Sequence, residues 1–213
     1  MKAFDLTHTV KEDMTVYPGT EAPRLIAAST HERDGFRETA LSVFSHVGTH
    51  IDAPAHIVEG GATLDSLPAE QFIGRALVID CRDLKEDDII TRERLLSYGS
   101  RLDVVDFLLF NLGWDKKWGS EDYLRGYPTL DLQAIDLILE KGYKGIGIDA
   151  ISLDPISGGL ARHKRLFSGR TIINIENLKG LEGLPKQPFF FACLPLKFEN
   201  SDGAPARAIA WID

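Results

Sequence analysis

The residues with the clearest chemical potential lie in one short segment, residues 45–56. It holds three of the six histidines of the chain, His46, His50 and His56, together with the carboxylate of Asp52. Imidazole and carboxylate groups together are suitable ligands for zinc, manganese or iron, and the segment has no cysteine of the kind that structural zinc sites use. Buried ionisable groups rarely lack a partner, so this crowding favours a metal site over four unrelated side chains.

The spacing of these residues predicts a bend in the backbone. In an extended chain the even spacing would direct His46, His50 and Asp52 to one face. A straight strand would nevertheless separate His46 from His50 by about 13 Å, at a rise of about 3.3 Å per residue, which is too far for two ligands of one ion. Gly48 and Pro54 oppose a helix. We therefore expect the chain to bend at residues 48 and 49, where glycine has no Cβ to obstruct it.

The elements that must position this segment follow from apolar runs and helix caps. Thr91 is expected to cap a helix through Tyr98, and Asp131 a helix that closes at Gly142. Strands alternate with these helices, which predicts an α/β fold with a mixed sheet. No repeat or linker divides the chain, so residues 1–213 are expected to form one domain. Strands are predicted at residues 25–28, 39–44, 76–81, 104–112, 144–148, 171–175 and 189–196.

Composition excludes several classes of function. A formal charge of −8 and a pI near 5.3 disfavour nucleic-acid binding. No basic amphipathic segment, signal peptide or run of ~20 apolar residues is present, so we expect no membrane partner and a cytoplasmic location. The chain has no GxGxxG or P-loop motif of a nucleotide fold. Cys81 and Cys193 lie in apolar runs, which predicts small buried side chains rather than a disulfide or a metal site.

The segment HVGTHIDAPAH, residues 46–56, resembles the signature HxGTHxDxPxH of the cyclase superfamily of metal-dependent hydrolases, which includes bacterial kynurenine formamidases and isatin hydrolases. Four further segments resemble blocks of the same family, so the resemblance covers nearly the whole chain. It implies a mixed β-sheet or barrel-like β core flanked by helices, as in swivelling β/β/α folds. The four segments are VYPG at residues 16–19, GID followed by Ser152 and Asp154, His163 followed by ENL at 176–178, and LPLK with DGAPAR at 194–207.

The resemblance implies a set of metal ligands. His46, His50 and Asp52 would bind one ion, and Asp52 would bridge to a second ion held by His163 and Glu176. The implied cofactor is one or two divalent ions, with Zn²⁺ expected first and Mn²⁺ as the alternative, because the same ligands accept both.

The second ion has alternative ligands. The interval between His163 and Glu176 is one residue longer than the resemblance implies, and residues 168–170 could absorb the extra residue. Glu182 and Glu199 are the other carboxylates that could serve, although neither lies in a matching motif.

The resemblance also implies a reaction. His56 would stay off the metal and act as general acid and base, a role for which a reference pKa near ~6.5 is suitable. The expected activity is that of an arylformamidase-like amidohydrolase, in which metal-activated water cleaves the C–N bond of an aryl formamide such as N-formylkynurenine, or of a related lactam. The alternatives are a family enzyme acting on a different cyclic or acyl substrate, as hydrolase or lyase, and a non-catalytic metal-stabilised binding module. An unliganded His56 beside the ion counts against the binding module.

Three residues are candidates for contact with a small-molecule substrate. Tyr17 occupies the position where the resemblance implies a tryptophan that stacks on an aromatic substrate. Asp149 and Ser152 are candidates for the pocket. An equally weighted interpretation is structural, with Asp149 at the end of a strand and Ser152 in a turn. The loop of Tyr17 is expected to reach a neighbouring subunit, because members of the family form homodimers or homotetramers.

Overall fold

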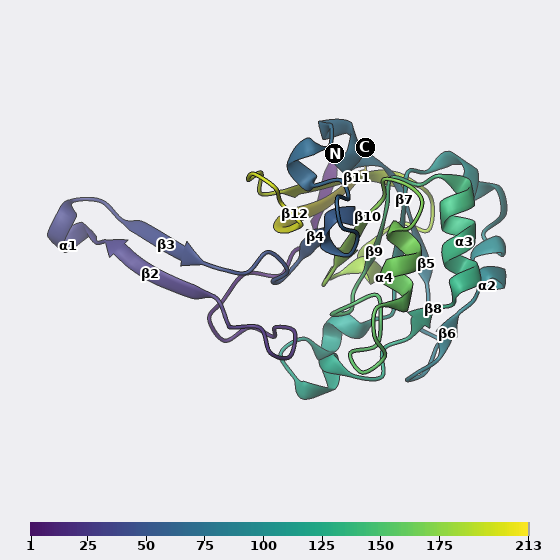
Figure 1. The fold of residues 1–213 in the computed structure, drawn as a ribbon, viewed down its shortest axis with the longest axis horizontal. Helices are drawn as coiled ribbons and strands as arrows, with labels where there is room; N and C mark the ends of the chain where they lie inside the picture. The colour runs from purple at the N-terminus through teal and green to yellow at the C-terminus, as the bar shows by residue number, and fades with distance from the viewer. Residues whose placement is uncertain (213) are drawn as a thin grey trace.

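The computed structural model describes residues 1–212 and is built around a closed β-barrel (Figure 1). Seven strands form the ring in the order β12-β11-β5-β7-β9-β10-β4, and β4 pairs back with β12 to close it. β1 (Lys2–Asp5) pairs with the outer edge of β12. The predicted α/β class is therefore confirmed, and of the mixed sheet or barrel-like core that the resemblance implies, the structure has the barrel.

The ring combines parallel and antiparallel pairs. β5, β7, β9 and β10 run parallel, whereas β4, β11 and β12 are antiparallel to their ring neighbours. The ring strands are β4 (His50–Asp52), β5 (Ile73–Asp80), β7 (Phe107–Asn111), β9 (Gly145–Ile148), β10 (Ile173–Glu176), β11 (Phe189–Pro195) and β12 (Gly203–Ile212).

Two apolar cores lie on the two faces of the barrel wall. Successive side chains of a strand point to opposite faces, so Leu109 belongs to the core that also contains Ile51 and Phe191, while its neighbour Leu108 belongs to the core that contains Ile135 of the helical layer. Near-continuous apolar runs such as 76–79 and 107–110 arise because both faces are covered.

The outer layer consists of α2 (Arg92–Leu96), α3 (Leu132–Lys141) and α4 (Ala161–Phe167). The two predicted N-caps are present: Thr91 accepts a hydrogen bond from the amide of Arg94, and Asp131 accepts one from the amide of Ala134. Gly142 ends α3 in the left-handed conformation, with φ 75°. The helix capped by Thr91 ends at Leu96, earlier than predicted.

Short segments connect these elements. β6 (Ile89–Ile90) and β8 (Thr129–Leu130) form a small parallel pair. The 3₁₀ turns are η1 (Pro54–His56), η2 (Leu64–Ser66), η3 (Ala69–Phe72), η4 (Gly99–Val104), η5 (Trp114–Lys117), η6 (Glu121–Leu124) and η7 (Leu181–Gly183). Because η4 occupies residues 99–104, the strand predicted at 104–112 begins only at Phe107.

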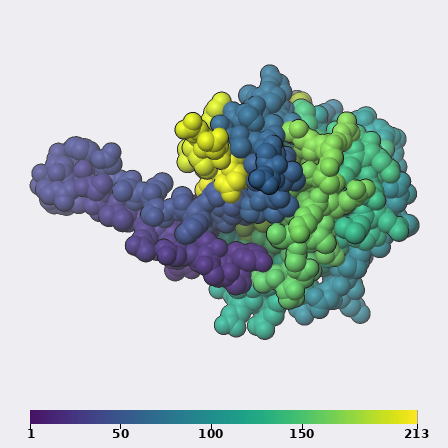
Figure 2. All heavy atoms as spheres, viewed as in Figure 1, coloured from purple at the N-terminus to yellow at the C-terminus, as the bar shows by residue number. Residues whose placement is uncertain are grey.

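A hairpin projects far from the barrel (Figures 1 and 2). It consists of β2 (Arg24–Ser29), β3 (Glu38–Ser42) and, at its tip, α1 (His31–Asp34). Every residue of β3 is exposed, and so are all residues of β2 except Ser29. The hairpin therefore contributes almost nothing to either core.

Both cysteines are buried free thiols, as predicted. Cys193 lies in β11 and Cys81 directly follows β5. Among the described residues, no helix has the length and apolar character needed to cross a membrane.

Candidate metal centre

Two antiparallel strands place the first candidate ligands side by side. In the β4–β10 register His50 is opposite Glu176, and Asp52 is opposite Asn174. Directly opposite side chains of paired strands point to the same face with their Cβ atoms about 5 Å apart. His50, Asp52 and Glu176 are all buried, so the pairing gathers one imidazole and two carboxylates inside the protein.

The bend predicted at Gly48 is present and brings His46 back to this cluster. Gly48 has φ 63°, a left-handed conformation that a residue with a Cβ seldom adopts. The side-chain amide of Asn177 donates a hydrogen bond of 2.8 Å to the carbonyl of Gly48, and the hydroxyl of Thr49 donates one of 2.6 Å to the carbonyl of Asn177. The ring centroids of His46 and His50 are 5.2 Å apart as a result.

Asp52 lies at the middle of the cluster. Its Oδ1 is 2.7 Å from His46 Nδ1 and 3.2 Å from His50 Nε2. Its Oδ2 is 3.4 Å from Nε2 of His163, which comes from α4. One carboxylate thus faces three imidazoles, two through one oxygen and the third through the other.

Glu176 completes the group. Its Oε1 is 3.2 Å from His163 Nε2 and its Oε2 is 3.6 Å from His50 Nε2. Glu182 instead pairs with Lys116 at 2.7 Å on the surface, and Glu199 is exposed. The structure therefore brings Glu176 to the cluster, and neither of the two alternative carboxylates.

Each of the three clustered imidazoles has its outer nitrogen held by an acceptor. His46 Nε2 is 2.9 Å from Asp202 Oδ2, His50 Nδ1 is 2.8 Å from the Gly48 carbonyl, and His163 Nδ1 is 2.8 Å from Asp154 Oδ2. In a neutral imidazole, an acceptor at one ring nitrogen fixes the proton there and leaves the other nitrogen with a lone pair that a metal can take. All three free nitrogens face Asp52, which is the arrangement that metal-ligating histidines require.

The charges of the cluster favour a cation. Burial lowers the pKa of His163, but the hydrogen bonds that its ring donates to Asp154, Asp52 and Glu176 outweigh burial and raise the pKa to about 12. Burial also lowers the pKa of His46, whereas its contacts with Asp52 and Asp202 raise it to about 9. Burial raises the pKa of Asp52, but its contacts with the three imidazoles lower it well below its usual range. A divalent ion would supply the positive charge that protonated imidazoles otherwise provide, so the residues fit a metal.

His56 lies at the edge of the cluster and differs from the other three imidazoles. Within residues 1–212 its ring makes no hydrogen bond, and Asp202 Oδ2 lies 3.9 Å from its Nδ1. Burial, the largest influence, lowers its pKa from the ordinary value. Ligand atoms of His46, Asp52 and His56 also lie within 4.8 Å of one another, so distance alone would permit His56 to bind the same ion.

A cavity of about 380 Å³ opens over the cluster. Tyr17, Phe44 and Leu160 supply part of its apolar wall, and Ser152 also lines it. A space of this size can enclose a small organic molecule, with polar chemistry at one end and apolar contacts around it.

Asp149 has a different place. Its buried carboxylate accepts hydrogen bonds from the amides of Leu112, at 2.8 Å, and Trp114, at 3.1 Å, and it does not line the cavity. Burial raises its pKa to about 7. The geometry assigns Asp149 to the loop that follows β7 rather than to the substrate.

Three residues that hold the cluster in shape were absent from the predicted site. They are Asn174, Asn177 and Asp202. Asn174 Nδ2 donates hydrogen bonds of 2.9 Å to both Asp52 Oδ2 and Glu176 Oε1, which keeps the two carboxylates side by side. The i, i+2 spacing of Asn174 and Glu176 within a strand could have indicated this contact. Asp202 opens the DGAPAR segment that resembles a family block, but nothing local links it to His46, which is 156 positions away.

Comparison with known proteins adds the family. The model of the cyclase family, described as "Putative cyclase", matches residues 4–155. The chain belongs to the cyclase family. An uncharacterised protein of Methanocaldococcus jannaschii is 32% identical over 99% of both chains. A kynurenine formamidase of Bacillus cereus is 29% identical over 97% of this chain and 95% of its own length.

Two solved structures superpose on nearly the whole chain. Isatin hydrolase A from Labrenzia aggregata superposes with a TM-score of 0.86 and 27% identity, over 98% of this chain and 93% of its own. A structure described as a potential metal-dependent hydrolase with cyclase activity gives a TM-score of 0.80 and 29% identity, over 98% and 96%. These relatives are named as hydrolases, and this cyclase-family chain has the His, Asp and Glu groups that could bind a metal ion.

Proposed function

We propose that this cyclase-family protein is a metal-dependent hydrolase that cleaves the C–N amide bond of an aryl formamide or a related lactam. The observation that carries the proposal is the orientation of three imidazoles, His46, His50 and His163, whose outer nitrogens are hydrogen-bonded and whose inner nitrogens converge on Asp52. The names of two relatives, kynurenine formamidase and isatin hydrolase, support this substrate class.

The ligands divide into two sets that share Asp52. His46, His50 and Asp52 would hold one ion, and Asp52, His163 and Glu176 would hold the second. A divalent ion at this position would lower the pKa of a bound water and polarise a carbonyl oxygen. We propose zinc first and manganese as the alternative, because imidazole and carboxylate ligands accept both.

His56 would move the proton. His56 lines the cavity, and its ring centroid is 3.9 Å from that of His46. The imidazole of His56 could therefore reach a substrate held over the cluster. With a lowered pKa the imidazole is neutral at pH 7 and can accept a proton from the attacking water. The same group can then return the proton to the leaving nitrogen as the C–N bond breaks.

The apolar wall would bind the ring of the substrate. Tyr17 and Phe44 lie on the cavity wall, and an aromatic side chain can stack on a flat aromatic group. Ser152 also lines the cavity, and its hydroxyl would supply a polar contact. This combination favours an aryl substrate over a purely polar one.

The experiment is a metal analysis followed by an activity panel. Protein purified without added metal is analysed for elemental content, then assayed against aryl formamides and lactams before chelation, after chelation and after metal is restored. We expect one or two equivalents of zinc or manganese and hydrolysis that disappears and returns with the metal. Bound metal without turnover on any substrate would instead support a metal-stabilised binding module, and turnover without uptake of water would support a lyase.

We also propose that the protein assembles as a homodimer or homotetramer. The hairpin β2–β3 exposes large apolar side chains, with Ile26 54% and Leu41 66% exposed, and Phe44 at its base is 53% exposed. A two-stranded hairpin is at best marginally stable in water by itself, so a second copy of the chain would cover this arm. Analytical ultracentrifugation tests the assembly, and a double I26E/L41E variant should shift the protein toward the monomer. A monomeric wild type at micromolar concentration would reject it.

We further propose a cytoplasmic location, which the two buried free thiols support, since a reducing compartment keeps cysteines unpaired.

A further inference from the structure

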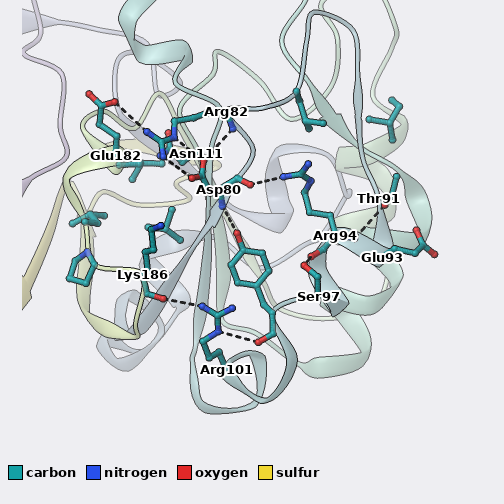
Figure 3. A pocket seen from close by; sticks show the side chains of 17 residues that line it. Asp80, Arg82, Thr91, Glu93, Arg94, Ser97, Arg101, Asn111, Glu182 and Lys186 are labelled. Atoms are coloured by element: carbon teal, nitrogen blue, oxygen red, sulfur yellow. Dashed lines mark hydrogen bonds and ion pairs between the residues drawn. The ribbon is translucent and has the colours of Figure 1, made fainter.

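A second cavity, of about 760 Å³, lies where β5 and β7 end and shares no lining residue with the candidate metal centre (Figure 3). One wall comes from Asp80 and Asn111, at the carboxyl ends of the two parallel strands. The others come from α2 with the η4 segment that follows it, and from residues 181–186. A crevice beyond the carboxyl ends of parallel strands is a common place for ligands.

Most of the charges in this cavity are neutralised within the protein. Arg82 forms a bidentate pair with Asp80, at 2.8 and 2.7 Å, and Arg94 forms one with Asp83, at 2.8 and 2.6 Å. Glu182 also lines the cavity and is paired with Lys116, which does not. These pairs leave little charge for a ligand to meet.

Arg101 and Lys186 are the cations that remain. Within residues 1–212 neither has a carboxylate partner within 4.0 Å. Arg101 is nevertheless held in place: its Nε donates to the Tyr98 carbonyl at 3.2 Å, its Nη1 donates to the Lys186 carbonyl at 3.3 Å, and its Cζ lies 4.8 Å from the Tyr98 ring centroid. Its Nη2 makes no hydrogen bond to the described residues. A fixed guanidinium with free N–H groups is prepared for a carboxylate.

Among residues 1–212, Glu93 is the acid of the cavity lining that has no cation within 4.0 Å. Figure 3 places Glu93 beside Thr91 at the opposite rim from Arg101 and Lys186. The end of the cavity that holds Arg101 and Lys186 is therefore positive, and it favours an anion over a cation.

A buried amide adds a second recognition group. Asn111 is only 2% exposed, and its Oδ1 accepts a hydrogen bond from the amide of Gly113 at 3.1 Å. Its Nδ2 donates to no atom of residues 1–212, although Asn111 lines the cavity. Because this donor has no protein partner among these residues and its side chain lines the cavity, an acceptor oxygen on a ligand, or a water in its absence, can bond to it.

Part of the remaining wall is apolar, although Thr91 and Ser97 also line it. Val78, Leu181, Leu184 and Pro185 line the cavity together with the ring of Tyr98. An inorganic anion would leave this surface uncovered, whereas an organic acid would use both the charge and the apolar wall.

We propose that this cavity binds a small organic carboxylate: Arg101 and Lys186 receive the carboxylate, the apolar wall receives its body, and Asn111 donates to a further oxygen. This site is independent of the proposed hydrolase function, because none of its residues belongs to the metal centre.

The test is a site-resolved titration of the metal-loaded protein. Cyclohexanecarboxylate, cyclohexylmethanol and inorganic phosphate are added separately while the backbone amides of residues 97–101, 181–184 and 186 are followed by NMR. Site resolution is needed because a carboxylate can also bind a metal ion. We expect saturable shifts with the carboxylate, and binding at least about fivefold weaker for the alcohol, which lacks the charge, and for phosphate, which lacks the apolar body.

Two variants and their controls complete the test. R101Q and K186A should each weaken binding of the carboxylate at least about threefold while hydrolysis is unchanged. The matched controls are R170Q, at an arginine that also donates to a carbonyl (Leu139) and has no acid partner among the described residues, and K197A, at an exposed lysine outside the cavity. Both should bind as the wild type does. Absence of shifts at these amides, tighter binding of phosphate than of the carboxylate, or unchanged affinity in both R101Q and K186A would overturn the proposal.

Discussion

His46 Nε2 lies 2.9 Å from Asp202 Oδ2, although the two residues are 156 positions apart. The contact exists because β4 pairs with β12 and closes the barrel. Asp52 is opposite Gly203 in that pairing, so the loop before β12 lies beside the bend before β4. Asp202 thereby fixes the proton of His46 on Nε2 and directs Nδ1 to Asp52. The closing seam of the barrel is therefore part of the candidate metal centre.

Replacing Asp202 tests this relationship. D202N keeps the size of the side chain but weakens the acceptor for His46, so metal affinity should fall about 10- to 100-fold, as is usual when the partner of a ligating histidine is lost. A competition titration with a chromogenic chelator measures the change. D122N, at an exposed aspartate of η6, is the matched control and should bind metal as the wild type does. Equal affinities of the two variants would show that Asp202 does not orient His46.

Replacing His56 separates a proton carrier from a ligand. H56A should lower turnover by about 10²- to 10⁴-fold, the usual contribution of a general acid and base, while the metal content stays near that of the wild type. Elemental analysis and steady-state kinetics on the same preparation provide both numbers. A matching loss of metal would place His56 among the ligands, which the short distances to His46 and Asp52 also allow.

Replacing Gly48 tests the bend. A side chain at φ 63° costs about 1–2 kcal/mol, and a Cβ there would lie 3.0 Å from the Cε of Met14. G48A should therefore lower both the free energy of unfolding and the affinity for metal, because the bend positions His46 and His50. The control is G60A, where φ is 71° and a Cβ would meet nothing within 4 Å. The G60A variant should lose a similar amount of stability and keep the metal affinity of the wild type. A G48A variant with wild-type metal affinity would exclude a role for the bend in metal binding.

Asp149 predicts a pH dependence of stability. Burial raises its pKa from 3.8 to about 7, so between these values the folded state holds a proton that the unfolded state has lost. The contribution of Asp149 is complete below pH 4 and declines as the pH rises toward 7, by up to about 1.4 kcal/mol per pH unit. Urea unfolding of the wild type and of D149N at saturating metal measures it. The free energy of the wild type minus that of D149N should fall by about 2 kcal/mol from pH 5 to pH 7. A constant difference would mean that the buried carboxylate stays ionised throughout.

Local signals in the sequence predicted a large part of the fold. Thr91 and Asp131 are caps because their side chains accept hydrogen bonds from amides three residues ahead, a contact that depends on a single turn of chain. Apolar runs located β5, β7, β9, β10 and β11 to within a few residues, since strands covered on both faces must be apolar throughout. These runs predicted the α/β class, whereas the resemblance of the motif at residues 46–56 to the cyclase family implied a mixed sheet or a barrel-like core.

Short elements were beyond local prediction. β4 has three residues and α4 has seven, too few to be stable without the packing that surrounds them. The η4 turn occupies the start of a predicted strand, and of its residues only Leu102 is buried.

The sequence by itself determined the chemistry of the candidate centre: which imidazoles and carboxylates are present, and where glycine permits the chain to turn. Only the tertiary structure decided which of them meet. It placed Glu176 rather than Glu182 or Glu199 beside His163, set Asp149 against the backbone of Leu112 and Trp114, and brought Asp202 to His46. The physical reason is that strand register and barrel closure join residues from distant parts of the chain, and these pairings depend on the packing of the whole ring rather than on any local run of residues.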